Sequence, residues 1–548
     1  MTIEMKPCHM KQRPSLRFFL TGLLLCSASM AWGQSWTVQT LSPRVLADGQ
    51  PVKIAIAVPV ETASAAIPVR HVLVYLQPGG TPMLKVANGS TDFSLGGPWV
   101  RGSPQLRAQG ISVIYVDVPS DAERRGITAR PPREVRQDLA AAVKEARQQF
   151  PGVEVHLAGF SAVAPVLDIA GGLDGISKIV LAGGALGNFR AKDWSDVRQP
   201  VLMLHAPSAQ CDNAPFLEAE AVAKRSRFTF VKVGYERQDS KADCGRTSQH
   251  VFHGQEAAFS KAIADWLDGK EIPPVIGYAN PQVAWREEVI TYSAPSTFGS
   301  NLLEATLLLP EAGRFGAGPY PVAVWNHGDA SVDMDAVRYK SRVRDMLVAR
   351  EFLQLGVAVL IPARRGVGMS EGSFAKGFSK QDGDATYKAR MQAEDILPAL
   401  AWLKSRSELD ANRVIMSGQS AGGYSAMYIA SQNPAGLIGA VDFSGGRNDI
   451  KEGSGAGYLN QMMVNGFAEF GKTTQVPTFW VFAENDTRYT ANTIRASHEA
   501  FQAVGGKARL LLSPPIEGDG HHIYHKPTFW RGALKEYLTE IGVVANAK

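Results

Sequence analysis

The chain has 548 residues, of which 45% are hydrophobic and 20% charged, with 53 glycines and 32 prolines. This composition excludes a disordered, collagen-like or coiled-coil chain, and the length predicts more than one hydrophobic core. The formal net charge is +5, but the first 33 residues hold four basic residues and one acidic residue, so their removal leaves a charge near +2. A balance this close to neutral gives no electrostatic footprint for nucleic-acid binding.

The first 33 residues follow the pattern of a secretory signal peptide. Basic residues precede a short apolar run over 18–26, and small side chains at Ala31 and Gly33 indicate a cleavage site. The run is too short to span a bilayer, and no later stretch reaches 18 apolar residues. We therefore expect an exported protein, periplasmic or secreted, without membrane association after signal removal. A retained N-terminal anchor is the alternative.

Residues 34–272 alternate predicted strands with helices. Apolar runs without strict alternation predict buried strands, an amphipathic pattern predicts a helix over 132–149, and a closing helix is expected over 254–267. The predicted strands are 71–76, 111–118, 153–160, 179–181 and 201–204.

Two cysteines remain once the signal peptide, which contains Cys8 and Cys26, is removed. They are Cys211 and Cys244. An even pair in an oxidising compartment predicts a disulfide, and two buried free thiols are the alternative.

The composition changes over 268–282, where the Pro273-Pro274 pair indicates a linker. Residues 273–548 then repeat the order of elements seen in the first half. The predicted strands are 321–325, 357–361, 413–419, 439–443 and 478–482, and the predicted helices are 385–405 and 421–432. The whole chain therefore predicts two tandem α/β domains, each with a mostly parallel sheet covered by helices on both faces.

The strongest motif lies between a predicted strand and a predicted helix of the second half. Gly418-Gln419-Ser420-Ala421-Gly422 matches the G-x-S-x-G pattern of a nucleophile elbow. Such a turn exposes the serine hydroxyl, and its two glycines allow the strand and the helix to pass closely. Ser420 is therefore the predicted nucleophile.

A nucleophilic serine needs a base and an acid that orients the base, in the chain order Ser, Asp, His. Asp486 follows an apolar strand and is the predicted acid, with Glu484 as the alternative. His521 follows Gly520 in a glycine-containing loop and is the predicted base, with His522 as the alternative.

The tetrahedral intermediate also needs N–H donors already in place. We expect one from the backbone of Ala421 and one from the loop that contains Gly328 and Asp329. His327 is expected to position this loop rather than to catalyse. Arg364 and Arg365 are interpreted as a support for the loop, with an anion-binding role as the alternative.

These motifs resemble the α/β-hydrolase superfamily, specifically its dienelactone-hydrolase and prolyl-oligopeptidase-like serine hydrolases. The resemblance covers about residues 285–540 and extends to the segments 326–328, 363–372, 442–447 and 519–521. It implies hydrolysis of an ester-type bond through an acyl-enzyme on Ser420, with a peptidase or amidase activity as the alternative. Dienelactone hydrolases use a cysteine at the nucleophile position, so lactone chemistry does not follow from it.

The first half carries a weaker elbow, in which Ser161 follows Gly159 but Val163 replaces the second glycine. His250 lies where a catalytic histidine belongs, and His253 is the alternative.

This half resembles bacterial secreted α/β-hydrolase domains, which carry an aspartate shortly before the first of two loop cysteines. Here Asp212 follows Cys211 instead, which places the orienting acid in doubt. A second active site of Ser161, Asp212 and His250 and a non-catalytic binding domain both remain open.

No metal-binding or nucleotide-binding motif is present in the sequence, so we expect no metal and no cofactor. The expected partner is a small-molecule or short-peptide substrate, and the sequence does not determine the oligomeric state.

Overall fold

The computed structural model describes residues 36–544, except 61–66, 80–83, 86–89, 92–96, 123–126, 128–129, 185–188, 191, 213, 240–243, 246, 281, 297–298, 330–341, 374–385 and 447–455. The predicted signal peptide, with Cys8 and Cys26, lies outside the described residues. No helix in the described part of the chain has both the length and the apolar content that a membrane span requires.

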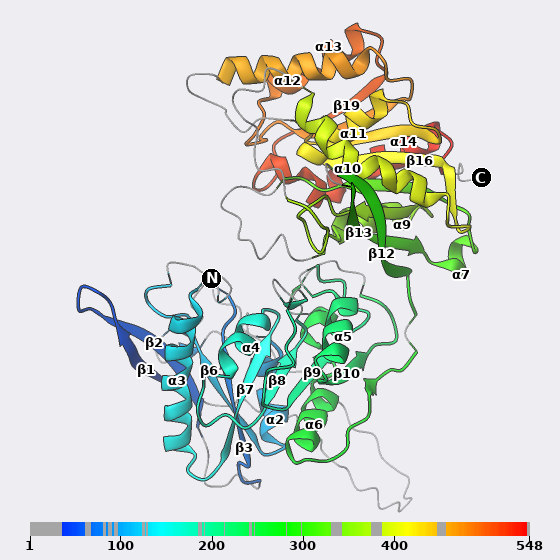
Figure 1. Ribbon diagram of the computed structural model, residues 1–548. Coiled ribbons are helices and arrows are strands. Elements are labelled where there is room, and N and C mark those ends of the chain that lie inside the picture. Colours follow the sequence, from blue (N-terminus) through cyan, green and yellow to red (C-terminus); the bar gives the residue numbers. More distant parts are fainter. Residues whose placement is uncertain are drawn as a thin grey trace, which may run out of the picture.

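A nine-stranded sheet forms the centre of the first domain (Figure 1). Its order is β1-β2-β6-β3-β7-β8-β9-β10-β11, in which β1, β2 and β6 pair antiparallel and the later neighbours pair parallel. The strands are β1 (Trp36–Val45), β2 (Pro51–Pro59), β3 (His71–Leu76), β6 (Ile111–Val116), β7 (Glu154–Phe160), β8 (Ile179–Ala182), β9 (Val201–His205), β10 (Thr229–Gly234) and β11 (Val275–Gly277). A separate short pair consists of β4 (Leu84–Lys85) and β5 (Ser90–Thr91).

The second domain is built on an eight-stranded sheet whose order matches that of the first sheet from β1 to β10. Its order is β12-β13-β15-β14-β16-β17-β18-β19, with β12, β13 and β15 antiparallel and the rest parallel. The strands are β12 (Trp285–Ser296), β13 (Gly299–Pro310), β14 (Tyr320–Asn326), β15 (Ala358–Pro362), β16 (Leu409–Gln419), β17 (Leu437–Phe443), β18 (Thr478–Ala483) and β19 (Ala508–Ser513). The predicted fold class, two tandem and mostly parallel α/β domains, is confirmed.

Helices cover both faces of each sheet. The first domain has α1 (Pro98–Arg101), α2 (Ser103–Arg107), α3 (Pro132–Gln149), α4 (Ala164–Ala170), α5 (Phe216–Arg225), the 3-10 turn η5 (Gln249–Val251) and α6 (Glu256–Leu267). The second has α7 (Ala312–Phe315), α9 (Met346–Leu353), α10 (Tyr387–Leu403), α11 (Ala421–Ser431), α12 (Ala456–Gly471), α13 (Ala491–Ala503), the 3-10 turns η6 (Gly520–His525) and η7 (Pro527–Phe529), and α14 (Arg531–Glu540).

The helix predicted over 132–149 shows why the sequence folds this way. The buried residues of α3 include Val135, Leu139, Ala142 and Ala146, a spacing of three to four that places them on one face. They pack in the same core cluster as Val72 of β3. Each sheet has such a cluster on either face, so its strands are buried on both sides, as continuous apolar runs require.

The structure adds elements that the sequence analysis did not identify. Each sheet begins with an antiparallel pair, β1–β2 and β12–β13. In addition, β11 lies within the segment predicted as a linker and extends the first sheet beyond residue 272.

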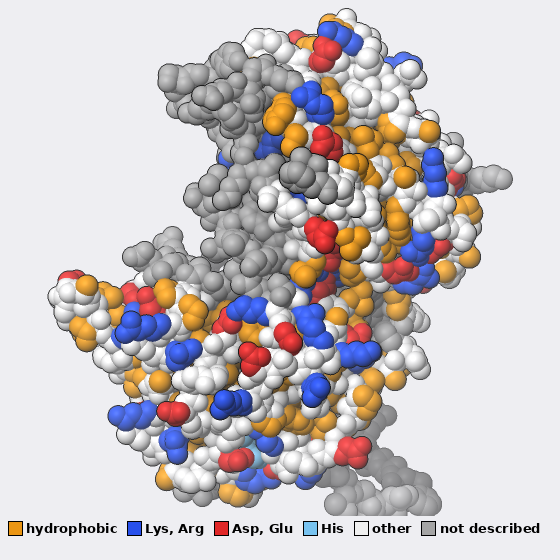
Figure 2. All heavy atoms as spheres, in the orientation of Figure 1, with side chains coloured by type: hydrophobic (Ala, Val, Ile, Leu, Met, Phe, Trp, Pro, Cys, Tyr) orange, Lys and Arg blue, Asp and Glu red, His pale blue; other side chains and the backbone are white. Residues whose placement is uncertain are grey.

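The two domains are stacked, and the chain passes between them beside the first sheet (Figure 1). Arginines and glutamates from both domains meet between them. Arg190 and Glu218 come from the first domain, and Glu287, Glu304 and Arg342 come from the second. We call these five residues the interdomain ion network. On the face drawn in Figure 2, basic and acidic side chains are interspersed over the first domain.

Candidate active site

Ser420 lies at a sharp turn between β16 and α11. Its backbone has φ 55° and ψ −124°, a conformation that a non-glycine residue adopts only where the surrounding structure imposes it. A Cβ at Gly422 would collide with the carbonyl oxygens of Asn326 and His327 at the end of β14. A Cβ at Gly418 would lie 2.7 Å from the Asn326 oxygen, so the two glycines of the motif allow the helix to pass close to the sheet.

The predicted base and acid lie beside this serine. His521 Nε2 is 3.0 Å from Ser420 Oγ, and His521 Nδ1 is 3.0 Å from Asp486 Oδ2. His521 belongs to η6, which follows β19, and Asp486 follows β18. All three residues therefore lie at the carboxyl edge of the parallel sheet, although they come from separate segments of the chain.

Asp486 is held as an acceptor. Its Oδ1 accepts the backbone N–H groups of Arg488 at 2.7 Å and Tyr489 at 3.1 Å, and the side chain is buried. These donors fix the orientation of the carboxylate, whose contact with Nδ1 turns Nε2 of His521 towards the serine. Nε2 is then free to accept the serine proton.

The two alternative residues lie elsewhere. Glu484 forms an exposed ion pair with Arg495 at 3.2 Å. His522 is exposed, whereas His521 is buried. The geometry thus singles out Asp486 and His521 over both.

The loop after β14 carries the other expected N–H donors, Gly328 and Asp329. Arg364 donates to the carbonyl oxygens of His327 at 2.5 Å and Gly328 at 3.2 Å, and to Asp329 Oδ1 at 3.1 Å. Among the described groups, the backbone N–H groups of Gly328 and Asp329 donate to no backbone oxygen. In the described part of the chain, the amide of Ala421 donates to no protein group. Arg364 is buried and supports the loop, as the sequence interpretation expected.

His327 also positions this loop. Its Nδ1 lies 2.8 Å from the Gly328 carbonyl oxygen, and its Nε2 accepts the amide of Arg364 at 3.3 Å. Burial, with the charge of Arg364, lowers the pKa of His327 to about 3. His327 is therefore a neutral, fully used ring rather than a base.

Asp329 is the charged member of the loop. Burial raises its pKa, but the charges of Lys388 and Arg364 outweigh burial and hold the pKa below its usual value. Gln392 also donates to its Oδ1 at 3.1 Å.

The first domain has an elbow at the equivalent position, between β7 and α4. Ser161 has φ 59°, close to the value at Ser420. Val163, where the second glycine would be, is fully buried. The Val163 side chain fits because the residue that faces it is Gly184, which has no Cβ. A Cβ at Gly184 would collide with the Val163 side chain. The turn is therefore retained without the second glycine.

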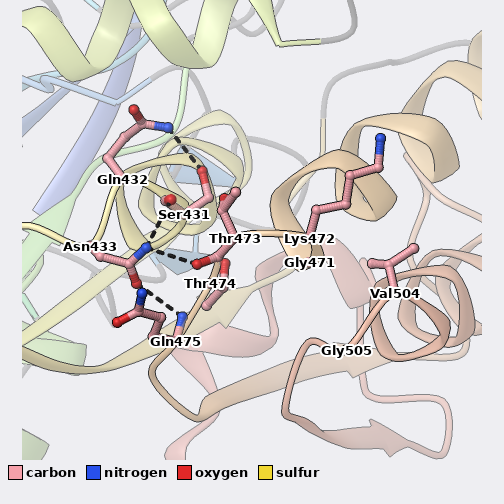
Figure 3. A pocket seen from close by; sticks show the side chains of 10 residues that line it. All are labelled: Ser431, Gln432, Asn433, Gly471, Lys472, Thr473, Thr474, Gln475, Val504 and Gly505. Carbon is pink, nitrogen blue, oxygen red and sulfur yellow. Dashed lines mark hydrogen bonds between the residues drawn. The ribbon is translucent and has the colours of Figure 1, made fainter.

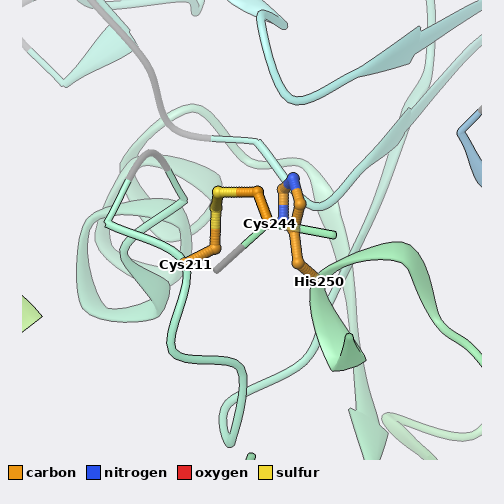
Figure 4. A group of neighbouring side chains, drawn as sticks. All are labelled: Cys211, Cys244 and His250. Atoms are coloured by element: carbon orange, nitrogen blue, oxygen red, sulfur yellow. A yellow bond between two sulfur atoms is a disulfide. The ribbon is translucent and has the colours of Figure 1, made fainter. Parts of the chain in front are cut away.

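His250 lies next to the disulfide that joins Cys211 and Cys244 (Figure 4). The predicted disulfide is thus confirmed, with the two Cα atoms 5.0 Å apart. The ring of His250 packs 4.8 Å from that of Phe160, and its Nδ1 has no hydrogen-bond partner among the described groups. Burial, with a contribution from the charge of His205, lowers the pKa of His250 to about 3. The alternative, His253, is exposed.

Asp212 does not orient His250, which corrects the predicted second site. Its carboxylate accepts the backbone N–H of Met346 at 3.2 Å, at the start of α9 in the second domain, and Arg344 lies 3.8 Å away. Asp212 therefore contacts the second domain rather than His250. The matching sheet orders place Ser208, not an aspartate, three residues after β9, where Asp486 stands after β18.

One buried acid of the second domain was missed by sequence reasoning. Asp442, at the end of β17, is fully buried, and neither of its carboxylate oxygens has a hydrogen-bond partner among the described groups. Burial raises its pKa well above the usual value, although the nearby amide of Gly445 opposes this shift. Its Oδ1 lies against Gly423 of α11, where a Cβ would collide with it. The only sequence signal is an acid that ends an apolar strand.

The family comparison matches a segment of the second half. Residues 346–437 match the model of the prolyl oligopeptidase family. No curated protein matches the sequence. An esterase from Pyrococcus furiosus is 17% identical with a TM-score of 0.33, over 46% of this chain and 90% of that one. Acylaminoacyl peptidase from Pyrococcus horikoshii is 14% identical with a TM-score of 0.35, over 48% and 43%. Est1E from Butyrivibrio proteoclasticus, with ferulic acid bound, is 16% identical with a TM-score of 0.32, over 44% and 95%.

The strand order of both sheets and the elbow between β16 and α11 are those of the α/β-hydrolase fold. The matched segment begins with α9 and ends at the start of β17, so it contains Ser420 but neither Asp486 nor His521.

One cavity of the second domain, with a volume of about 580 Å³, is drawn in Figure 3. It lies at the end of α11 that is far from Ser420, because Ser431 ends this helix. Its lining residues are Ser431, Gln432, Asn433, Gly471, Lys472, Thr473, Thr474, Gln475, Val504 and Gly505. Because α11 has 11 residues, the cavity is roughly 16 Å from the serine. At that distance the cavity does not hold the bond that Ser420 attacks.

Proposed function

We propose that the protein is a serine hydrolase that cleaves a carboxylic ester through an acyl-enzyme on Ser420. The observation that carries this proposal is the continuous contact from Ser420 Oγ through His521 to Asp486, at 3.0 Å on each side of the ring.

In this proposal, each step of ester hydrolysis is assigned to a residue. His521 Nε2 takes the hydroxyl proton as Ser420 Oγ attacks the substrate carbonyl carbon. The amide of Ala421 and an amide of the Gly328–Asp329 loop donate to the oxyanion. His521 then gives its proton to the leaving alcohol, which leaves an acyl group on Ser420. A water molecule, deprotonated by His521, releases the acid and restores the serine.

A fluorophosphonate probe tests this chemistry, because it labels only an activated serine. The wild-type protein and Ser161→Ala should take up label equally, and Ser420→Ala should take up none. Turnover of Ser420→Ala should fall by about 10⁵–10⁶ with an unchanged circular dichroism spectrum. Absence of label on the wild-type protein contradicts the proposal.

The same experiment addresses the first domain, for which we propose no hydrolytic role. The support is the position of Asp212, which accepts the amide of Met346, and the Nδ1 of His250, which has no hydrogen-bond partner among the described groups. Loss of label from Ser161→Ala would refute this part alone.

A peptidase or amidase is the second candidate, favoured by the match of residues 346–437 to the prolyl oligopeptidase family. Both activities use the same triad, so the bond must be identified by substrate. A panel of aryl esters compared with aminoacyl amides of matched acyl groups separates them. A higher kcat/KM on the amides would favour the peptidase.

We further propose that the protein is exported and acts on a small molecule or a short peptide, without a cofactor. The disulfide and the N-terminal sequence pattern support export. N-terminal sequencing of the protein recovered from the producing cells should then begin at Gln34, and an intact N-terminus would contradict export with cleavage.

A further inference from the structure

Two histidines and a glutamate meet at the amino ends of the central strands of the first sheet, whereas the elbow follows the carboxyl end of β7. His71 begins β3, and Glu154 begins β7 with His156 two residues later. The strand register pairs His71 with Glu154, so all three side chains lie on one face at the amino ends of neighbouring parallel strands. Ser161 follows the other end of β7.

The potential ligand atoms of these residues lie close together. His71 Nδ1 is 3.1 Å from His156 Nε2, and Glu154 Oε2 is 3.8 Å from the former and 3.9 Å from the latter. Zinc bonds of about 2.0–2.1 Å in tetrahedral geometry separate ligand atoms by roughly 3.3–3.4 Å. A small rotation of the glutamate would therefore complete three corners of a tetrahedron.

The surroundings favour this use of the histidines. His71 Nε2 is 3.0 Å from Asp268 Oδ1, which fixes the proton on Nε2 and directs the lone pair of Nδ1 into the cluster. A carboxylate on the outer nitrogen of a histidine is the usual companion of a metal-ligating ring. Without an ion, the 3.1 Å contact with His71 requires a proton on His156 Nε2. Metal binding requires that proton to move to His156 Nδ1, which has no partner among the described groups.

Glu154 is 55% exposed, yet its carboxylate points at the two histidines, and its described ion pairs are with these two rings. The nearby cations already have partners. Arg70 and Lys270 pair with Asp268, and Lys178 donates to carbonyl oxygens at the end of α6. The carboxyl end of a helix is itself favourable for positive charge.

We propose that His71, His156 and Glu154 bind a divalent transition-metal ion of the zinc class. The fourth position is open to solvent on the exposed side of Glu154. Such an ion joins β3 to β7 and, through Asp268, to the end of α6, so its role is to stabilise the first domain. It lies apart from the triad of Ser420 and goes beyond the proposed hydrolysis.

Zinc titration of the chelator-treated, untagged full chain by isothermal calorimetry tests the site. We expect one equivalent to bind and to raise the melting temperature. Glu154→Gln, at an exposed position, should weaken zinc binding at least tenfold without lowering the melting temperature of the metal-free protein. Glu271→Gln, an exposed control, should leave zinc binding unchanged. Asp268→Asn should weaken it by roughly 10–100-fold.

Absence of zinc binding by the wild-type protein overturns the proposal, and the histidine pair is then only a hydrogen-bonded contact. Equal binding by the wild-type protein and Glu154→Gln also overturns it, because the ion must then occupy other histidines, such as His522 and His525. Cobalt substitution gives an independent readout, since tetrahedral cobalt absorbs visible light. Fluorophosphonate labelling of Ser420 is expected in every case, so failure of this site leaves the proposed function untouched.

Discussion

Replacing Glu218 with alanine tests how firmly the two domains are joined. Glu218, on α5 of the first domain, accepts hydrogen bonds from Arg342 of the second domain, including one of 3.0 Å from Nη2, and from Arg190 at 3.1 Å. The side chain of Arg342 is 1% exposed and that of Glu218 is 5% exposed. The substitution therefore leaves buried guanidinium groups with fewer acceptors.

The expected loss follows from the partners that remain. Removal of one partner of a buried ion pair costs about 3–5 kcal/mol, since the other charge stays desolvated. Here Arg342 keeps Glu287 at 2.6 Å and Arg190 keeps Glu304, so we expect the lower end, about 3 kcal/mol. Glu220→Ala is the matched control on the same helix. Glu220 pairs with Lys232 at the surface, with both side chains about two-fifths exposed, and such a pair contributes at most about 1 kcal/mol.

Urea unfolding of the full chain, followed by circular dichroism, measures the difference. Glu218→Ala should shift the midpoint to clearly lower urea than Glu220→Ala does. Limited proteolysis should also cut the segment 268–282 faster in Glu218→Ala, because the domains separate more readily. Equal midpoints for the two variants would show that the interdomain ion network contributes no more than a surface pair, and would refute the reasoning.

Three further predictions concern the elbow, the disulfide and the response to acid. Gly422→Ala should destabilise the protein by roughly 1–3 kcal/mol and lower its turnover, because the added Cβ collides with two backbone oxygens. Gly532→Ala, which has open space around it, should leave the stability of the protein unchanged. Equal stability of these two variants would contradict the packing account. Cys211→Ser should destabilise the first domain by about 3–4 kcal/mol, and a scanning calorimetry trace in which both domains shift equally would count against a local effect. Burial raises the pKa of Glu287, but the charges of Arg344 and Arg342 outweigh it and lower the pKa to about 2. The stabilising effect of the Glu287 carboxylate is therefore present above pH 4.5 and is lost as the pH falls towards 2. Glu287→Gln should flatten the acid part of the plot of unfolding free energy against pH. An unchanged slope would refute this prediction.

The sequence by itself determined the local features. The buried strands, the helix over 132–149 and the elbow at Ser420 could be predicted because each depends on the spacing of apolar residues or glycines within a short segment. The antiparallel pairs β1–β2 and β12–β13 were missed. β12 alternates buried and exposed residues, so it lacks the continuous apolar run by which the other strands were recognised, whereas β2 and β13 are buried over their second halves and were missed despite their apolar runs.

Only the tertiary structure decided the partners of charged groups. The chain order was enough to predict His521 and Asp486, with His522 and Glu484 as alternatives that the hydrogen bonds of the triad then set aside, because the carboxyl ends of parallel strands meet at one edge of the sheet. It was not enough for Asp212, since whether this acid turns towards His250 or towards Met346 depends on how the second domain docks. The cluster of His71, Glu154 and His156 likewise exists only through the register of β3 and β7. Charges act through space at a few ångströms, so their roles follow from packing rather than from spacing along the chain.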